Sequence, residues 1–206
     1  MLLLQVDRID IILQWMLVHW VEITGSVLGL VGVWLEAKQN IWCWPVGLLN
    51  VIISMWVFFF SKLYADVILQ VFYLVITIYG WYFWVFGGQK KYEVPIRKLF
   101  RKEFIVMLIL GFGLTGVLGY FLRNYTDAAF PYWDSLVTVW GVIATYAMAK
   151  KIMEHWLMWI VINLNCTAIY FFKHLFAFSP LYFIFTLLSV YGYLKWKKDY
   201  TKQRAA

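Results

Sequence analysis

Seven apolar stretches separated by short polar segments constrain this chain more than any other feature. They cover residues 20–37, 42–61, 63–86, 104–122, 131–149, 156–173 and 177–196. A helix that crosses the hydrocarbon core of a bilayer needs about 20 mostly apolar residues, and each stretch is close to that length. Of the 206 residues, 64% are hydrophobic and 14% are charged, whereas a soluble domain has about 25% charged residues. The pattern therefore predicts an all-α transmembrane fold with seven spanning helices.

The segment before the first span, residues 1–19, is apolar but is interrupted by Asp7, Arg8 and Asp10. It has no basic region ahead of its apolar run and no small-residue cleavage site, so it does not have the pattern of a signal peptide. We expect an amphipathic helix that lies in the membrane interface. A further crossing by residues 2–18 is the alternative.

Basic residues fall mostly on one side of the predicted spans. With seven spans, that side receives Lys38, Lys90, Lys91, Arg97, Lys98, Arg101, Lys102, Lys150, Lys151, Lys195, Lys197, Lys198, Lys202 and Arg204. The other side receives Lys62, Arg123, Lys173 and Arg8. Because cytoplasmic loops carry the excess of Lys and Arg, the distribution predicts a cytoplasmic C-terminus. We interpret the net charge of +7 as this orientation signal and not as a nucleic-acid-binding surface.

The chain also resembles itself at a constant offset of 112 residues. The matched positions include Ala37-Lys38 with Ala149-Lys150, Trp44 with Trp156, Tyr79-Gly80 with Tyr191-Gly192, and Trp84 with Trp196. This repetition predicts two parallel three-helix repeats, a plan known among transporters and similar to that of the SWEET sugar transporters. The first repeat would cover residues 20–86 and the second, with a basic cytoplasmic tail, residues 131–206. A basic cytoplasmic loop and a linker helix would occupy residues 87–130.

Polar and aromatic residues recur at helical spacing in four of the spans. Residues spaced three and four apart share one face of a helix, and polar groups inside a membrane usually face the protein interior. The candidate ligand-binding residues on these faces are Trp44 and Asn50, Gln70 and Tyr73, Thr138, and Trp156, Trp159 and Asn163. Two other interpretations remain open, since Trp44 has the position of an interfacial-belt residue and the two asparagines suit hydrogen bonds between helices.

No pattern in the chain indicates catalysis or metal binding. His19, His155 and His174 lie near span ends, Cys43 and Cys166 lie within apolar stretches, and no pair has metal-ligand spacing. We therefore expect no catalytic residue, no metal and no cofactor, and a transporter in place of an enzyme. An intramembrane enzyme and a membrane scaffold or receptor are the competing classes.

The predicted faces suit a flat, polar and possibly cationic ligand. Trp attracts a cation over its ring, by about 2 kcal/mol when the cation is desolvated, and Asn both donates and accepts hydrogen bonds. An N-ribosylated pyridinium or a thiazolium has this chemistry, and so do other planar molecules.

Two sequence motifs resemble the PnuC family of bacterial vitamin transporters. One is Trp156-x-x-Trp159-x-x-x-Asn163 followed by Tyr170-Phe171-Phe172-Lys173, and the other runs from Gln39-Asn40 through Trp44-Pro45-x-Gly47 to Asn50. The resemblance extends from about residue 21 to residue 198. It implies a protein of the bacterial inner membrane that takes up nicotinamide riboside by facilitated diffusion, with phosphorylation in the cytoplasm trapping the substrate.

The same resemblance implies which residues contact the ligand. Trp156, Trp159 and Asn163 would do so from the second repeat, and Gln39, Asn40, Trp44 and Asn50 would face them from the first. It also implies a homotrimer in contact with membrane lipid. Close relatives carry thiamine or riboflavin on the same fold, so the vitamin itself remains open.

Overall fold

Seven long helices account for most of the chain in a computed structural model that describes residues 20–60, 62, 64–88, 94–172 and 178–205. The helices are α2 (Trp20–Ala37), α3 (Cys43–Phe60), α4 (Tyr64–Phe86), α5 (Arg101–Tyr125), α6 (Pro131–Ala149), α7 (His155–Phe172) and α8 (Phe178–Ala205). In the described part of the chain the only β-type pairing is an isolated parallel bridge between Arg97 and Ile152. The expected all-α fold is thus confirmed, and each of the seven predicted spans coincides with a helix. The amphipathic helix expected in residues 1–19 lies outside the described residues.

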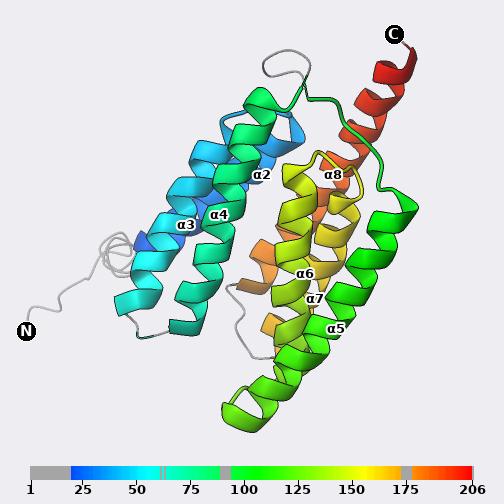
Figure 1. The fold of residues 1–206 in the computed structure, drawn as a ribbon. Helices are drawn as coiled ribbons and strands as arrows, with labels where there is room; N and C mark the ends of the chain where they lie inside the picture. Colours follow the sequence, from blue (N-terminus) through cyan, green and yellow to red (C-terminus); the bar gives the residue numbers. More distant parts are fainter. Residues whose placement is uncertain (1–19, 61, 63, 89–93, 173–177, 206) are drawn as a thin grey trace, which may run out of the picture.

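The length and composition of the helices are those of a multi-pass membrane protein. Within the described residues, α3, α4, α5 and α7 are long and apolar enough to cross a bilayer, and α2 contains a shorter apolar segment, Ile23–Ala37. Helix α8 has 28 residues, or about 42 Å at 1.5 Å per residue. It is therefore longer than the hydrocarbon core of about 30 Å, and its basic C-terminal part extends past the rest of the bundle (Figure 1).

The distribution of side chains is the reverse of that in a soluble protein. Large apolar residues cover the outside, with Ile109 and Val117 of α5 67% and 70% exposed. Most of the large side chains that are almost fully buried are aromatic or polar, and the set comprises Trp44, Trp156, Trp196, His155, Ser135, Ser189 and the aliphatic Ile152. An outer surface of this kind is stable against lipid tails and would aggregate in water.

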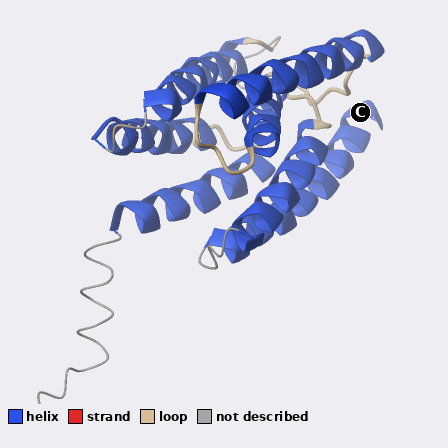
Figure 2. Ribbon diagram, turned by 90° about the horizontal axis from the view of Figure 1, so that it is seen from below, coloured by secondary structure: helices blue, strands red, loops and turns tan. Residues whose placement is uncertain are grey.

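The helices form two groups of three with α5 at one edge (Figure 1). In the first group α3 packs on both α2 and α4, and in the second group α7 packs on both α6 and α8. The groups meet through two contacts, α2 with α8 and α4 with α6, while α5 packs on α6. Figure 2, turned by 90°, shows the helices and the described loops between them. A space that lies between α2, α4, α7 and α8 is consequently bounded by both groups.

A tryptophan packs directly on a glycine in each group. The Trp44 ring lies against Gly80, and the Trp156 ring lies against Gly192, so closely that a Cβ atom at either glycine would overlap the indole. Both indoles are almost fully buried, at 2% and 1% exposure. Glycine is required at these two positions because the neighbouring helix approaches to within the thickness of one aromatic ring.

The loops at the end of the bundle that contains Lys38 and Lys150 also have matching backbones, and we call this end the basic end. Gln39 after α2 has φ of 55° and Lys151 after α6 has φ of 51°. A left-handed residue just after a helix is a common way to end it. The amides around the two residues make equivalent bonds, for example Asn40 N to Leu35 O at 2.9 Å and Ile152 N to Ala147 O at 3.0 Å.

We expect Gly80→Ala and Gly192→Ala to destabilise the protein by about 1–3 kcal/mol, because an added methyl group forces the buried indole out of its place. Gly113→Ala and Gly116→Ala are matched controls, since nothing lies within 4 Å of a Cβ at either position. The controls should change stability by less than about 1 kcal/mol. Thermal unfolding of the purified protein in detergent, followed by tryptophan fluorescence, measures both. Equal melting temperatures for the Gly80 and Gly113 variants would contradict the packing described here.

Candidate functional site

A cavity of about 570 Å³ lies between the two helix groups. Its walls come from α2, α3, α4, α7 and α8, with Met148 as the contribution of α6. This volume is within the range of about 300–1,000 Å³ that is usual for small-molecule sites. Of the ten candidate residues, six line it: Asn50, Gln70, Tyr73, Trp156, Trp159 and Asn163.

The other four candidates do not line the cavity. Trp44 packs on Gly80 and lies edge-on to Trp84 with 5.4 Å between ring centroids. Gln39 and Asn40 belong to the loop between α2 and α3, and Thr138 is half-buried in α6. The structure thus brings together six candidates from α3, α4 and α7 and leaves outside the cavity Trp44, Thr138 and the two residues of the α2–α3 loop.

Two of the cavity-lining positions of α2, Gly25 and Gly29, are glycines. Asn50 of α3 lies over Gly25 and Gly29, where an added Cβ would lie 3.7 Å from Asn50 Oδ1 and 3.9 Å from Asn50 Nδ2. A Cβ on Gly29 would also lie 3.0 Å from Cζ of Phe185 on α8. The absence of side chains here leaves room for a ligand beside the amide of Asn50.

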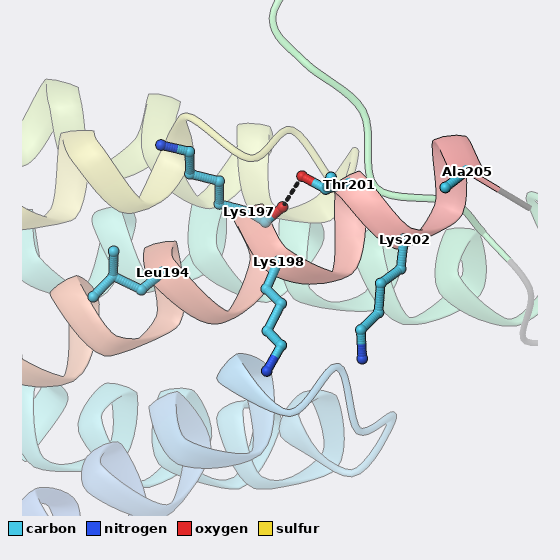
Figure 3. A pocket seen from close by; sticks show the side chains of 6 residues that line it. All are labelled: Leu194, Lys197, Lys198, Thr201, Lys202 and Ala205. Carbon is cyan, nitrogen blue, oxygen red and sulfur yellow. Dashed lines mark hydrogen bonds between the residues drawn. The ribbon is translucent and has the colours of Figure 1, made fainter.

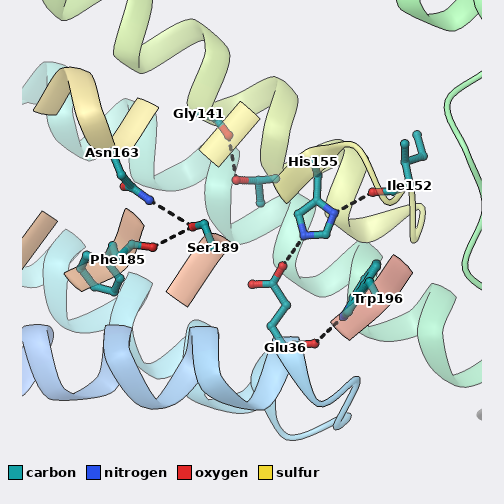
Figure 4. A network of polar contacts seen from close by, with 9 residues as sticks. Glu36, Gly141, Ile152, His155, Asn163, Phe185, Ser189 and Trp196 are labelled. Carbon is teal, nitrogen blue, oxygen red and sulfur yellow. Dashed lines mark hydrogen bonds and ion pairs between the residues drawn. The ribbon is translucent and has the colours of Figure 1, made fainter. Parts of the chain in front are cut away.

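On the opposite wall, Asn163 of α7 is linked to α8. Its Nδ2 donates to Ser189 Oγ at 3.4 Å, and Ser189 Oγ donates to the carbonyl of Phe185 at 2.8 Å (Figure 4). Asn163 is 5% exposed, and its Oδ1 has no hydrogen-bond partner among the described residues. The amide is therefore held in place with an acceptor left for a ligand.

Three residues that line this wall, Tyr182, Phe185 and Ser189 of α8, were not among the sequence candidates. The spacing of these residues in the sequence could have identified them. Together with Gly192 and Trp196 they step by 3, 4, 3 and 4 along the sequence, which places all five on one helix face.

A polar network borders the cavity at the basic end. Glu36 of α2 accepts from or shares a proton with His155 of α7, with 2.6 Å between Oε1 and Nε2. His155 Nδ1 lies 2.6 Å from the carbonyl of Ile152, and Trp196 Nε1 donates to the carbonyl of Glu36 at 3.2 Å (Figure 4). Glu36 is another lining residue that the sequence did not indicate, because it directly precedes the Ala37-Lys38 pair that marks a span end.

Lys151 braces the same end from the loop between α6 and α7. Its Nζ donates to the carbonyl of Val94 at 2.9 Å and to Oε1 of Gln39 at 3.3 Å, and it lies 4.5 Å from the ring centroid of Trp84. Burial lowers the pKa of Lys151 to about 8. Arg97 N and Met153 N make backbone bonds across the same junction, to Lys151 O at 3.0 Å and Arg97 O at 2.8 Å, so the segment after α4 is tied to the second helix group.

Another hollow, of about 480 Å³, lies along the outside of α8 beside Leu194, Lys197, Lys198 and Thr201 (Figure 3). All of its lining residues come from this one helix, so no second wall exists to hold a ligand. Among the described residues, no group of three His, Cys, Asp or Glu side chains is placed to hold a metal ion.

Fold and cavity together define a multi-pass helical membrane protein with a ligand-sized site between its helices. Residues 19–198 match the family model of the nicotinamide mononucleotide transporters, and the chain belongs to this family. The resemblance to PnuC vitamin transporters is thereby confirmed, and the protein is a transporter and not an enzyme.

Individual vitamin transporters are similar to this chain over most of its length. The chain is 30% identical to the nicotinamide riboside transporter PnuC of Escherichia coli (strain K12), over 86% of this chain and 84% of that protein. It is 26% identical to the riboflavin/roseoflavin transporter RibM of Streptomyces davaonensis, with the same shares covered. The crystal structure of the vitamin B3 transporter PnuC matches with a TM-score of 0.71 at 22% identity, over 89% of this chain and 83% of that one, which supports the fold.

We expect the stability of the protein to rise with pH through the titration of Lys151. A lysine whose pKa is about 8 when folded and 10.5 when unfolded costs stability while it is charged. That cost is fully present below about pH 8 and is relieved as the pH rises toward 10.5. The melting temperature of the wild type, measured between pH 7 and pH 9.5, should therefore rise relative to that of Lys151→Met. Parallel pH profiles for the two proteins would contradict this.

Proposed function

We propose that the protein imports nicotinamide riboside and that the cavity between the two helix groups is its binding site. The observation that carries the proposal is the convergence of Trp156, Trp159 and Asn163 on one cavity in a chain of this transporter family. Indole faces attract a pyridinium cation, and the amides of Asn50 and Asn163 suit the carboxamide and hydroxyl groups of the nucleoside.

The lining favours a nucleoside over its phosphate ester. No Lys or Arg occurs among the described residues that line the cavity. A phosphate group would enter such a site without a cationic partner, and burying an unpaired charge costs several kcal/mol. The uncharged ribose hydroxyls of nicotinamide riboside need only hydrogen-bond partners.

We propose that α2–α4 and α6–α8 are the two parallel repeats, within residues 20–86 and 131–206, and that α5 with the loop before it (residues 87–130) links them. The matched Trp–Gly packing and the matched left-handed residues Gln39 and Lys151 support this. A two-fold axis between the repeats would relate the contact of α2 with α8 to the contact of α6 with α4, and both contacts are present. Alternating access then consists of one repeat rocking against the other around the cavity.

Orientation and energetics complete the proposal. The basic end faces the cytoplasm of a bacterium, with the C-terminus on that side of the inner membrane, because Lys and Arg concentrate there. Transport is facilitated diffusion by a uniporter, and phosphorylation of the imported nucleoside in the cytoplasm keeps the flux inward. The protein works as a homotrimer, in which the exposed apolar face of α5 contacts lipid or a neighbouring copy.

Thiamine is the alternative substrate on the same fold, and riboflavin is another, since the relative RibM is a riboflavin/roseoflavin transporter. Thiamine shares the cationic aromatic ring of the proposed substrate. Calorimetry with the purified protein and each of the three vitamins distinguishes them. Preference for thiamine or riboflavin would replace the substrate and keep the site.

We expect Trp159→Ala and Asn163→Ala each to weaken binding of nicotinamide riboside by about tenfold or more, through the loss of a cation–π contact or of a buried hydrogen bond. The matched control is Asn165→Ala, two residues along the same helix. Asn165 does not line the cavity, and its side chain bonds Trp133 Nε1 at 2.9 Å and Val161 O at 2.6 Å. Calorimetric dissociation constants and uptake into proteoliposomes provide the readout. Unchanged binding in the Trp159 and Asn163 variants would refute the site.

A further inference from the structure

Among the described residues that line the cavity, Glu36 is the one with a formally charged side chain. The described lining residues otherwise comprise apolar, aromatic, amide and hydroxyl side chains, with Gly25 and Gly29. Glu36 is only 5% exposed. A carboxylate at such a position is costly to bury and indicates a functional role when it sits inside a membrane protein.

The hydrogen bonds of His155 show that the carboxylate of Glu36 forms the cavity-facing end of the pair. The carbonyl of Ile152 cannot donate a hydrogen bond, so His155 Nδ1, which lies 2.6 Å from it, must carry a hydrogen. A second proton must lie between His155 Nε2 and Glu36 Oε1, also 2.6 Å apart. When this proton resides on the imidazole, the two residues form an ion pair. His155 is completely buried and does not line the cavity, whereas Glu36 does, so the negative end of the pair faces the ligand space.

Glu36 also retains the capacity to contact a ligand. Only Oε1 is engaged by His155, and Oε2 has no hydrogen-bond partner among the described residues. Figure 4 shows this second oxygen pointing away from His155. The backbone beside it is fixed, because Trp196 Nε1 donates to the Glu36 carbonyl at 3.2 Å.

The charged and titratable groups described near the pair do not form a hydrogen bond with Glu36 Oε2. Lys151 donates to Val94 and Gln39, and Asp199 of α8 accepts from Gln39 at 3.0 Å and lies 3.5 Å from Lys195. The thiol Cys43 of α3 is close enough to interact electrostatically with both Glu36 and Lys151. Two phenols, Tyr73 of α4 and Tyr182 of α8, line the cavity itself.

We propose that Glu36 is the counter-ion of the binding cavity and gives the transporter its specificity for cationic heteroaromatic vitamins over neutral ones. This inference rests on the proposed function and narrows its substrate class. An N-ribosylated pyridinium or a thiazolium gains the attraction of the carboxylate in addition to that of the Trp156 and Trp159 rings. A neutral flavin gains neither the attraction of the carboxylate nor a cation–π contact with the indole rings.

The test compares two ligands that differ in charge and have nearly the same shape, nicotinamide riboside and its reduced dihydropyridine form, which is neutral. Calorimetry with the purified full-length wild type should show the cation bound about tenfold or more tightly than the neutral form, since a hydrogen bond or contact to a charged group is worth that factor. In Glu36→Gln the ratio of the two dissociation constants should fall about tenfold, which leaves only the preference that the Trp156 and Trp159 rings provide.

A structural role alone predicts another outcome. If Glu36 only joins α2 to α7, Glu36→Gln weakens both ligands by the same factor and leaves their ratio unchanged, which would overturn the inference. Glu154→Gln is the matched control, because Glu154 does not line the cavity and an amide oxygen replaces its bond to Leu99 N at 2.8 Å; its ratio should equal that of the wild type.

The comparison in the wild type stands even if the Glu36 variant does not fold. Equal affinity of the wild type for the charged and neutral forms overturns the role of Glu36 and leaves nicotinamide riboside as the substrate. Binding of neither form overturns the proposed function and, with it, this inference.

Discussion

The interior of a bilayer contains no water, and this constraint governs the whole structure. Each polar side chain within the helices must find a partner inside the protein or border a cavity that admits water or a ligand. Asn50, Asn163, Ser189 and Glu36 accordingly converge between the two helix groups, while large apolar residues such as Val117 cover the outside. The cavity between the helix groups is one place where this fold accommodates polar side chains.

Close aromatic packing then determines how the helices around that site are held. Trp44 on Gly80 and Trp156 on Gly192 bring neighbouring helices together within each group. At the basic end, the Glu36–His155 pair and the contact of Lys151 with Gln39 join the groups to each other. These interactions between groups must rearrange if the cavity is to open toward the basic end, and one of them involves Glu36, which lines the cavity.

The fold was predictable from the sequence because hydropathy reports bilayer crossing directly, and all seven spans appear as helices. Six of the ten candidates line the cavity for a related reason, since polar residues on one face of an apolar helix usually point to the protein interior. The sequence pattern could not separate Trp44 from Trp156, because the two have equivalent positions in the repeat and both pack on a glycine, yet only Trp156 lines the cavity. Glu36 was missed because a carboxylate beside a lysine at a span end has the pattern of an exposed residue, and only its contact with the distant His155 reveals its burial.

An experimental structure of the protein with nicotinamide riboside bound would show directly whether the cavity holds the substrate. We predict ligand density in the cavity between the helix groups, with the pyridinium ring against Trp159. The amide of Asn163 and Oε2 of Glu36 should contact the ligand. Ligand density elsewhere, or a cavity that remains empty at saturating nicotinamide riboside, would show that this cavity is not the transport site.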